Sequence, residues 1–344
     1  MRILIATNMA PFVWGGAEEL AVNLQRHLVD AGHDSEVLRI PYQWEPATGI
    51  PSQMYLARVL ACENADRVVA LKFPAYMVQH PHKTLWLLHQ YRQAYDLFDV
   101  GLSNLPPGEA GQRIRGAVIR ADAIAFSELD SIYVNSEVTQ RRLLQYNGIE
   151  STILLPPVND PELFVGGRSE GYVFAGGRIN GMKRQRLLVQ AAARVPSCRL
   201  VVAGPADSPE DARELVECVD DLGLRDRVTV DIRFLSRSEY AAYLNDAAAV
   251  AYLPLDEDSL GYVAMEAATA RKPIIATSDS GGVLGLVEDG VTGWVADPTI
   301  ESLADALASA VSGPGVCESL GVGAHDKLAA LSTSWEEILE RLLG

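Results

Sequence analysis

The fold of this chain is indicated by one segment, Tyr172-Val173-Phe174-Ala175-Gly176-Gly177-Arg178. This apolar run ends in paired glycines and a cation, and an amphipathic stretch at residues 184–194 follows it. A short apolar run bounded by a glycine turn is typical of a strand that is buried on both faces, whereas the stretch after it has the periodicity of a helix. The segment therefore predicts one strand–helix unit of a parallel sheet.

The same alternation extends along the chain on both sides of this segment. Further strands are predicted at residues 3–6, 67–71, 85–88, 131–134, 152–155, 199–203, 228–231, 249–253, 273–276 and 293–296. Helical patterns lie between or after them, among them residues 17–31, 209–222, 303–311 and 334–343. Because apolar strands separated by helices form parallel sheets covered on both faces, we expect an α/β fold.

A linker divides this series into two. Residues 156–161 contain three prolines, Gly166-Gly167 follows, and the strand–helix pattern restarts near residue 170. Domains typically have about 100–200 residues, so a chain of 344 residues suggests two of them. We therefore predict Rossmann-like domains at 1–165 and 166–325, followed by a C-terminal helical segment at 326–344.

Charge and composition exclude several classes of protein. The 45 acidic and 29 basic side chains give a net charge of −16, which argues against nucleic-acid partners and allows at most weak peripheral contact with membranes. The four cysteines are scattered, so neither a disulfide framework nor a zinc site is expected. No apolar run approaches a membrane span, and the apolar N-terminus is too short for a signal peptide. We expect a cytoplasmic protein without a transmembrane segment.

Two glycine-containing loops are candidate anion sites. Gly15-Gly16 opens a predicted helix, where backbone N–H groups can meet a phosphate, although a plain tight turn is the commoner explanation of such a pair. Arg178 and Lys183 follow the strand at 172–175, at the edge where open α/β sheets bind ligands. Two close cations suit a diphosphate. The alternative for this pair is a solvated basic loop.

The richest segment runs from Pro254 to Ala267, after the predicted strand at 249–253. A helix beginning at Gly261 can hold a phosphate at its N-terminus, and Asp258 and Glu266 can accept hydrogen bonds from sugar or ribose hydroxyls. The acids at 256–258 are otherwise explained as a solvated cluster that favours the helix dipole. Glu266 lies among apolar residues, so its carboxylate is either partly buried with a partner or functional.

One histidine ends a predicted strand. His89 follows the apolar run at 85–88, whereas His80 and His82 are interpreted as loop residues because no third metal ligand is evident. A lone histidine is more often structural than catalytic, but a position at a strand end favours a site role. No metal site is predicted.

These features together resemble glycosyltransferase family 4. The resemblance rests on Gly15-Gly16-Ala17-Glu18, on His89, on Gly177-Arg178 with Lys183, on the helix around Glu266, and on residues 270–277, 279–282 and 287–293. It implies the GT-B fold, in which two Rossmann-like domains face each other across a cleft. It also implies transfer of a sugar from a nucleotide diphosphate sugar to an acceptor, with retention of configuration, without a metal, and without a cofactor other than the donor substrate, of which UDP- and GDP-sugars are favoured.

The resemblance also assigns roles to residues. The first domain would be the acceptor side, the second would bind the donor, and the last helix would return to the first domain. Arg178 and Lys183 would grip the diphosphate and neutralise the leaving group, and His89 would lie near the reacting centre. The remaining donor contacts would come from Gly15, Gly16, Phe234, Leu235, Asp258, Gly261, Tyr262, Val263 and Glu266. Among these, Asp258 would face the transferred sugar, Glu266 the ribose, and Phe234 and Leu235 the base.

The sequence departs from the family pattern at Asp258, where the family has Glu, and at Ser259-Leu260-Gly261-Tyr262, which replaces Gly-Phe-Gly-Leu. These departures leave the donor sugar open. The acceptor is also open, with a saccharide, a glycolipid precursor and a small molecule as candidates. Two alternatives to a transferase are a sugar-nucleotide epimerase of the same fold and a non-catalytic sugar-nucleotide binding protein.

Overall fold

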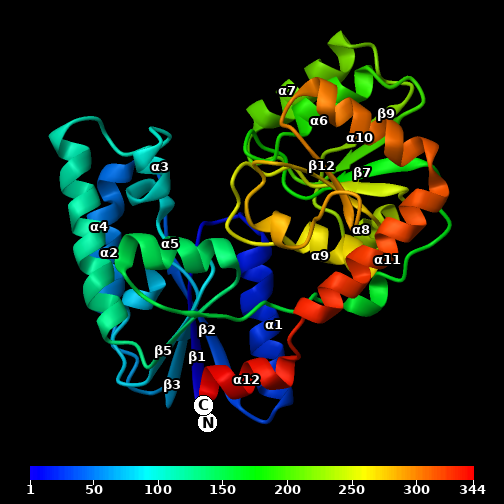
Figure 1. Cartoon of the computed structure of the whole chain (residues 1–344). Coiled ribbons are helices and arrows are strands. Elements are labelled where there is room, and N and C mark those ends of the chain that lie inside the picture. Colours follow the sequence, from blue (N-terminus) through cyan, green and yellow to red (C-terminus); the bar gives the residue numbers. More distant parts are fainter. The chain divides into compact units, whose positions relative to one another are not determined.

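The computed structural model describes residues 1–344 and divides into two compact units (Figure 1). The first unit comprises Met1–Pro157 and Thr333–Gly344, and the second comprises Val158–Ser332. The first boundary therefore lies between Pro157 and Val158, whereas the sequence predicted it after residue 165. The reason is that the linker packs on the second unit: Arg237 donates to the Asn159 carbonyl at 2.7 Å, and Asn245 donates to the Leu163 carbonyl at 2.8 Å.

The first unit contains a six-stranded parallel sheet with the order β2-β1-β3-β4-β5-β6. Its strands are β1 (Arg2–Met9), β2 (Asp34–Pro41), β3 (Arg67–Ala70), β4 (Lys83–Leu87), β5 (Ser131–Val134) and β6 (Thr152–Ile153). Its helices are α1 (Gly16–Asp30), α2 (Ile50–Arg58), α3 (Asp96–Asp99), α4 (Glu109–Ser127), α5 (Glu137–Asn147) and α12 (Trp335–Leu343).

The second unit contains another six-stranded parallel sheet, with the order β12-β11-β10-β7-β8-β9. Its strands are β7 (Tyr172–Gly176), β8 (Arg199–Ala203), β9 (Val228–Asp231), β10 (Ala249–Ala251), β11 (Ile274–Thr277) and β12 (Gly293–Ala296). Its helices are α6 (Gln185–Ala193), α7 (Pro209–Asp221), α8 (Arg237–Asn245), α9 (Tyr262–Thr269), α10 (Ile300–Ser312) and α11 (Pro314–Leu331). The predicted α/β class with parallel sheets is confirmed.

One strand was not predicted. β2 lies at the edge of the first sheet, and its residues are mostly half-buried or exposed. Charged side chains at Asp34, Glu36 and Arg39 interrupt its apolar character, so it shows no continuous apolar run.

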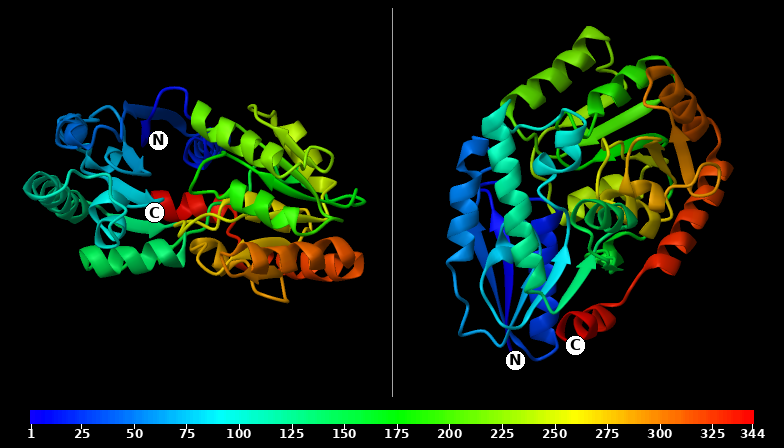
Figure 2. Two further views of the ribbon diagram at one scale, coloured as in Figure 1. Left: turned by 90° about the horizontal axis from the view of Figure 1, so that it is seen from above. Right: turned by 60° about the vertical axis from the view of Figure 1, so that its left-hand side comes forward.

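Alternation along the strands gives the first sheet two apolar faces. Ile3, Ile5 and Trp86 pack with α1 and α12 on one face, whereas Val68 and Leu85 pack with α2 and α4 on the other. Figure 1 shows these helix pairs on opposite sides of the sheet, and Figure 2 shows the layering from two further directions. Because helices cover both faces of the sheet, consecutive residues of its inner strands are mainly apolar.

The C-terminal helix completes the core of the first unit. The indole of Trp335 stacks on His27 with ring centroids 4.4 Å apart and meets Trp86 edge-on at 6.3 Å. Ile338 and Leu342 are fully buried, and the Leu342 carbonyl accepts a hydrogen bond from Thr84 at 3.1 Å. Although α12 is the last element of the sequence, its apolar face belongs to the first unit.

A carboxyl group is enclosed in the other half of this core. Asp122 of α4 is fully buried, and its two oxygens accept hydrogen bonds from the hydroxyls of Tyr76 and Tyr95, each at 2.7 Å. Burial raises the pKa of Asp122 to about 7, although the two tyrosine hydrogen bonds act in the opposite direction.

Replacing Asp122 by Asn is expected to change the pH dependence of stability. The pKa of Asp122 is about 7 in the folded chain and about 4 in the unfolded chain, so between these values only the folded chain binds the proton. Its contribution to the free energy of unfolding therefore falls by about 4 kcal/mol as the pH rises from 4 to 7. Asn does not titrate, so urea unfolding at several pH values should give a flatter profile for Asp122→Asn. Parallel profiles for the two proteins would contradict the prediction.

No helix in either unit combines the length and the apolar character that crossing a membrane requires.

Candidate functional site

The carboxyl ends of β7 and β10 bring the predicted diphosphate-binding residues of the second unit together. Lys183 lies in the loop after β7, and its Nζ donates to the hydroxyl of Tyr252 at 3.0 Å and to Glu257 at 2.5 Å. The ammonium also lies over the Tyr252 ring, 5.0 Å from its centroid. Burial alone would lower the pKa of Lys183, but Tyr252 and Glu257 outweigh it and raise this pKa above the ordinary value. Lys183 is therefore a fixed cation.

Arg178 comes from the same loop but is more exposed. Its Nη1 is 3.2 Å from both oxygens of Asp207, and Asn180 donates to the same carboxylate at 2.7 Å. The side chain of Arg178 is 39% exposed, so an exposed ion pair worth at most about 1 kcal/mol holds it. Both predicted cations thus have a carboxylate partner in this structure, Asp207 for Arg178 and Glu257 for Lys183.

Gly261, at the start of α9, packs against Tyr252, which is the residue that accepts from Lys183. It precedes the helix with φ +79°, and a Cβ atom there would lie 2.4 Å from the Tyr252 ring. Only glycine therefore lets this helix N-terminus approach the tyrosine that holds Lys183. The first N–H groups of α9, at Tyr262 and Val263, have no acceptors within the helix, as in any α-helix.

The acidic loop before α9 is held by the loop after β11. Asp256 donates its N–H to the Asp279 carbonyl at 2.8 Å, and Gly282 donates to the Glu257 carbonyl at 2.7 Å. A Cβ atom on Gly281 would lie 2.3 Å from the Glu257 carbonyl oxygen, so the two backbones are in direct contact. Asp258 is 5% exposed, which excludes the solvated acidic cluster for this residue.

Glu266 is buried and has a charged partner. Its carboxylate is 3% exposed and accepts from Arg237 at 2.5 Å. Arg237 also donates to the Asn159 carbonyl at 2.7 Å and lies over the ring of Phe164 at 4.7 Å. The sequence did not identify Arg237, because nothing local marks it as the partner of a carboxylate 29 positions away.

The two residues predicted to line the base follow β9. Phe234 is 64% exposed, whereas Leu235 is buried. Neighbouring Arg233 holds this loop through Asp231 at 2.9 Å and Glu239 at 2.8 Å. Phe234 therefore presents an uncovered aromatic ring from an anchored loop.

Arg184 is the residue of this site that the sequence reasoning left without a role. Its guanidinium donates to the carbonyls of Leu253 and Pro254 at 2.7 and 2.9 Å and to Thr277 at 2.7 Å. It also makes two bonds of 2.8 Å to Asp279. The backbone of Arg184 has φ 57°, which is unfavourable for a residue with a side chain. Arg184, the residue next to Lys183, thus connects the loop after β7 to the carboxyl ends of β10 and β11.

The predicted residues of the first unit lie at the ends of β1 and β4. The N–H of Gly15 donates to Glu18 at 3.0 Å, and the other oxygen of Glu18 accepts from buried Lys72 at 2.8 Å. Gly15-Gly16 is therefore a capped helix start, as the tight-turn interpretation expected, and the sequence did not reveal Lys72 behind it. A lysine directly after an apolar strand was the available signal.

His89 is exposed just after β4, and its Nδ1 lies 2.8 Å from the carbonyl oxygen of Gln90. A carbonyl only accepts, so Nδ1 carries the proton and Nε2 of the neutral ring is an acceptor. His80 and His82 bond to each other in a loop before β4, through Nδ1 of His80 and the His82 carbonyl at 2.7 Å.

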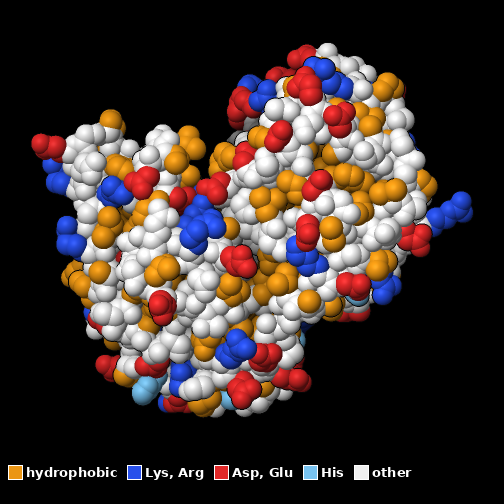
Figure 3. Space-filling view, in the orientation of Figure 1, with side chains coloured by type: hydrophobic (Ala, Val, Ile, Leu, Met, Phe, Trp, Pro, Cys, Tyr) orange, Lys and Arg blue, Asp and Glu red, His pale blue; other side chains and the backbone are white.

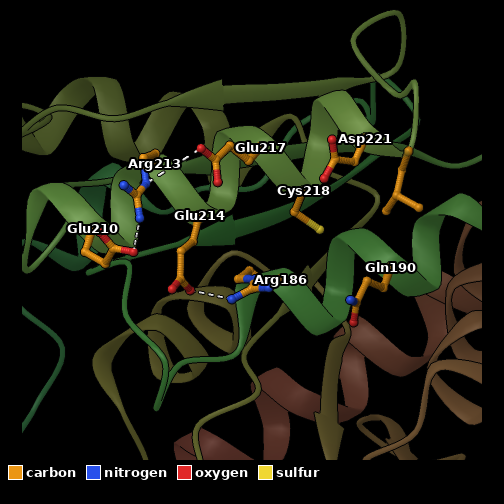
Figure 4. Close-up of a pocket in the computed structure, with 9 residues that line it drawn as sticks. Arg186, Gln190, Glu210, Arg213, Glu214, Glu217, Cys218 and Asp221 are labelled. Carbon is orange, nitrogen blue, oxygen red and sulfur yellow. Dashed lines mark hydrogen bonds and ion pairs between the residues drawn. The ribbon is translucent and has the colours of Figure 1, made fainter.

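A separate pocket of the second unit lies between α6 and α7 (Figure 4). Its arginines are paired within the pocket, Arg186 with Glu214, and Arg213 with Glu210 and Glu217. Figure 3 shows acidic and basic side chains intermingled at the end of the unit that carries α7. The pocket is not part of the strand-end site. Nowhere in the chain do three His, Cys, Asp or Glu side chains gather as metal ligands would.

Comparison with known proteins identifies the family. The family model of glycosyl transferases group 1 matches residues 167–326, which is nearly all of the second unit. Residues 167–326 of this chain thus form a glycosyl transferases group 1 domain. The chain is a glycosyltransferase, and the resemblance to glycosyltransferase family 4 is confirmed.

Among the relatives of this glycosyltransferase are two bacterial D-inositol 3-phosphate glycosyltransferases. The protein from Mycolicibacterium smegmatis is 27% identical over 88% of this chain and 74% of its own length. The protein from Kribbella flavida is 35% identical over 50% of this chain, and the match spans only 42% of its own length.

Solved structures share the whole fold of this glycosyltransferase. Sucrose-phosphate synthase from Thermosynechococcus elongatus is 17% identical, with a TM-score of 0.74 over 99% of this chain and 96% of its own. Anabaena HepE, solved in complex with UDP and glucose, is 17% identical, with a TM-score of 0.72 over 100% and 98% of the two chains. The GT-B architecture is confirmed at the level of fold.

Proposed function

We propose that this chain transfers a glycosyl group from a nucleoside diphosphate sugar to an acceptor hydroxyl, with retention of configuration and without a catalytic metal. The bond between the anomeric carbon and the phosphate oxygen breaks, and the nucleoside diphosphate leaves with the electron pair. The acceptor oxygen bonds to the anomeric carbon on the same face and gives its proton to the departing phosphate oxygen. The observation that carries this proposal is the fixed cation Lys183 beside the Gly261 start of α9.

In this proposal Lys183 and Arg178 stabilise the negative charge that develops on the leaving diphosphate. Their present partners, Glu257 and Asp207, are exchanged for phosphate oxygens when the donor binds. The backbone of Gly261, Tyr262 and Val263 adds donors at the helix N-terminus. Because the cations are already held at the strand ends, little reorganisation is needed at the moment of reaction.

The remaining residues orient the donor. Asp258 accepts from hydroxyls of the transferred sugar, and Glu266 accepts from the ribose while it remains paired with Arg237. Phe234, with Leu235 beneath it, covers the base. In the first unit the Gly15-Gly16 turn approaches the donor phosphate, and the Nε2 acceptor of His89 faces a sugar hydroxyl near the reacting carbon.

The choice of nucleotide follows from the fold neighbour rather than from a residue. We propose a UDP- or GDP-sugar as donor, with UDP to be tested first because HepE is solved with UDP and glucose. The relatives act on D-inositol 3-phosphate according to their names, so this compound is the first acceptor to test.

The test is a calorimetric binding screen of UDP, GDP and ADP, followed by turnover of the matching sugar nucleotides with and without acceptors. We expect one nucleotide to bind preferentially and its sugar to be transferred, with the same anomeric configuration in donor and product by NMR. EDTA should leave the rate unchanged. Donor isomerised without an acceptor would instead support the epimerase, and binding without any turnover would support the sugar-nucleotide binding protein.

A further inference from the structure

A chain of hydrogen bonds connects the buried carboxylate of Asp122 to the loop that carries His89. Tyr95 donates to Asp122 at 2.7 Å, and its hydroxyl oxygen accepts from Nδ2 of Asn147 at 3.2 Å. Oδ1 of Asn147 in turn accepts from Nε2 of Gln90. The backbone carbonyl of Gln90 accepts from Nδ1 of the preceding residue, His89, at 2.8 Å. The bonds made by Asp122, Tyr95, Asn147 and the Gln90 side chain each join two different segments of the first unit.

When Asp122 is ionised, as at pH 8, the direction of every bond in this chain is determined. An ionised carboxylate only accepts, so the Tyr95 hydroxyl must donate to Asp122 and is left to accept from an amide. The amide of Asn147 therefore directs its nitrogen toward Tyr95 and its oxygen toward Gln90, which fixes the orientation of the Gln90 amide as well. Gln90 is 2% exposed, so the protein interior holds this orientation with little competition from water.

The packing of this core does not by itself require a carboxylate. Asp122 lies on α4, whose Val118 and Phe126 belong to the hydrophobic core of this unit, as does Leu143 of α5. Enclosing a carboxyl group in such a place costs free energy that an apolar side chain would not. The group is compensated only because two tyrosine hydroxyls converge on it, and one of these begins the chain to His89.

We propose that Asp122 is a positioning residue for His89, acting through Tyr95, Asn147 and Gln90. The chain holds the side chain of Gln90 and through it the position of residue 90, whose backbone carbonyl holds the imidazole with the proton on Nδ1 and leaves Nε2 as an acceptor. The catalytic consequence rests on the proposed function, in which His89 meets the donor sugar.

The test compares Tyr95→Phe and Asn147→Ala with Tyr76→Phe as the matched control, at pH 8, where Asp122 is ionised. Tyr76→Phe removes one hydrogen bond from the same carboxylate but leaves the chain to His89 intact. We expect kcat to fall about tenfold in Tyr95→Phe and Asn147→Ala and to stay within twofold of wild type in Tyr76→Phe. Equal effects of the two tyrosine variants on kcat would reduce Asp122 to a packing role and overturn the proposal.

A second measurement does not depend on turnover. In protein labelled with ¹⁵N-histidine, the His89 signals, assigned with His89→Gln, should report the Nδ1–H tautomer in the wild type and Tyr76→Phe. The shifts should move toward a mixture of tautomers in Tyr95→Phe and Asn147→Ala. Unchanged shifts in both chain variants would overturn the positioning role. The expected shifts in a protein that transfers no sugar would leave the positioning intact and refute only the proposed function.

Discussion

Lys183→Ala is expected to lower kcat/KM by about 10²–10³-fold, the loss typical of removing one fixed donor to a developing anion. The effect should be large because Lys183 is immobilised by Tyr252 and Glu257 and is protonated at every working pH. No neighbouring lysine is available to replace it, since the chain has only Lys72, Lys83, Lys272 and Lys327 besides. Initial rates with the preferred sugar nucleotide measure the effect.

The matched control for Lys183→Ala is Lys327→Ala in the same unit. Lys327 pairs with Glu288 at 3.3 Å on the surface of α11, so its loss should leave both rate and stability near the wild-type values. Calorimetry adds a second criterion: the Lys183 variant should bind the nucleoside diphosphate more weakly and the free nucleoside equally well. Activity within a few-fold of wild type would remove Lys183 from the mechanism.

Glu266→Ala is expected to lower the free energy of unfolding by about 3 kcal/mol, because breaking a buried ion pair leaves the other charge without its partner. Glu266 is 3% exposed and the Arg237 side chain is 32% exposed, so the guanidinium cannot turn fully into water. Its remaining neighbours, the Asn159 carbonyl at 2.7 Å and Asp160 at 3.7 Å, compensate only in part. Urea unfolding followed by circular dichroism gives the difference.

Glu288→Ala serves as the control for this stability effect. It breaks an exposed glutamate pair in the same unit, and the expected change is below about 1 kcal/mol. The double variant Arg237→Met with Glu266→Leu should recover part of the lost stability, because neither charge then remains. A Glu266→Ala protein as stable as Glu288→Ala would show that the ion pair contributes nothing to the fold.

The sequence predicted the sheets well because their strands are covered on both faces. The run 199–203 coincides with β8, since burial on both sides demands a mainly apolar segment. The edge strand β2 was not predicted, because its exposed positions carry charged side chains. The helix α11 was not named either, and its glycines at 315, 321 and 323 weaken the helical pattern there.

The sequence indicated residues of the candidate site, but it did not indicate which side chains they contact. Arg178, Lys183 and Glu266 stand out because charged residues at strand ends or among apolar neighbours need an explanation. Their partners Asp207, Tyr252 and Arg237 lie 29, 69 and 29 positions away, and only the fold decides which side chains meet over such separations. Arg184 was missed because an arginine beside a glycine-containing loop has no local pattern that distinguishes a clamp from a solvated cation.

The position of α12 has a consequence for recombination. Because Thr333–Gly344 completes the first unit, the second unit is in topological terms an insert between Pro157 and Thr333, with both chain ends in the host. A hybrid made with a single crossover near residue 157 would join residues 1–157 of one protein to the C-terminal helix of another. The residues of that helix equivalent to Trp335 and Ile338 would then have to pack into the core of a different protein. Exchange of the second unit between relatives, in evolution or in engineering, should therefore succeed through two junctions and fail through one.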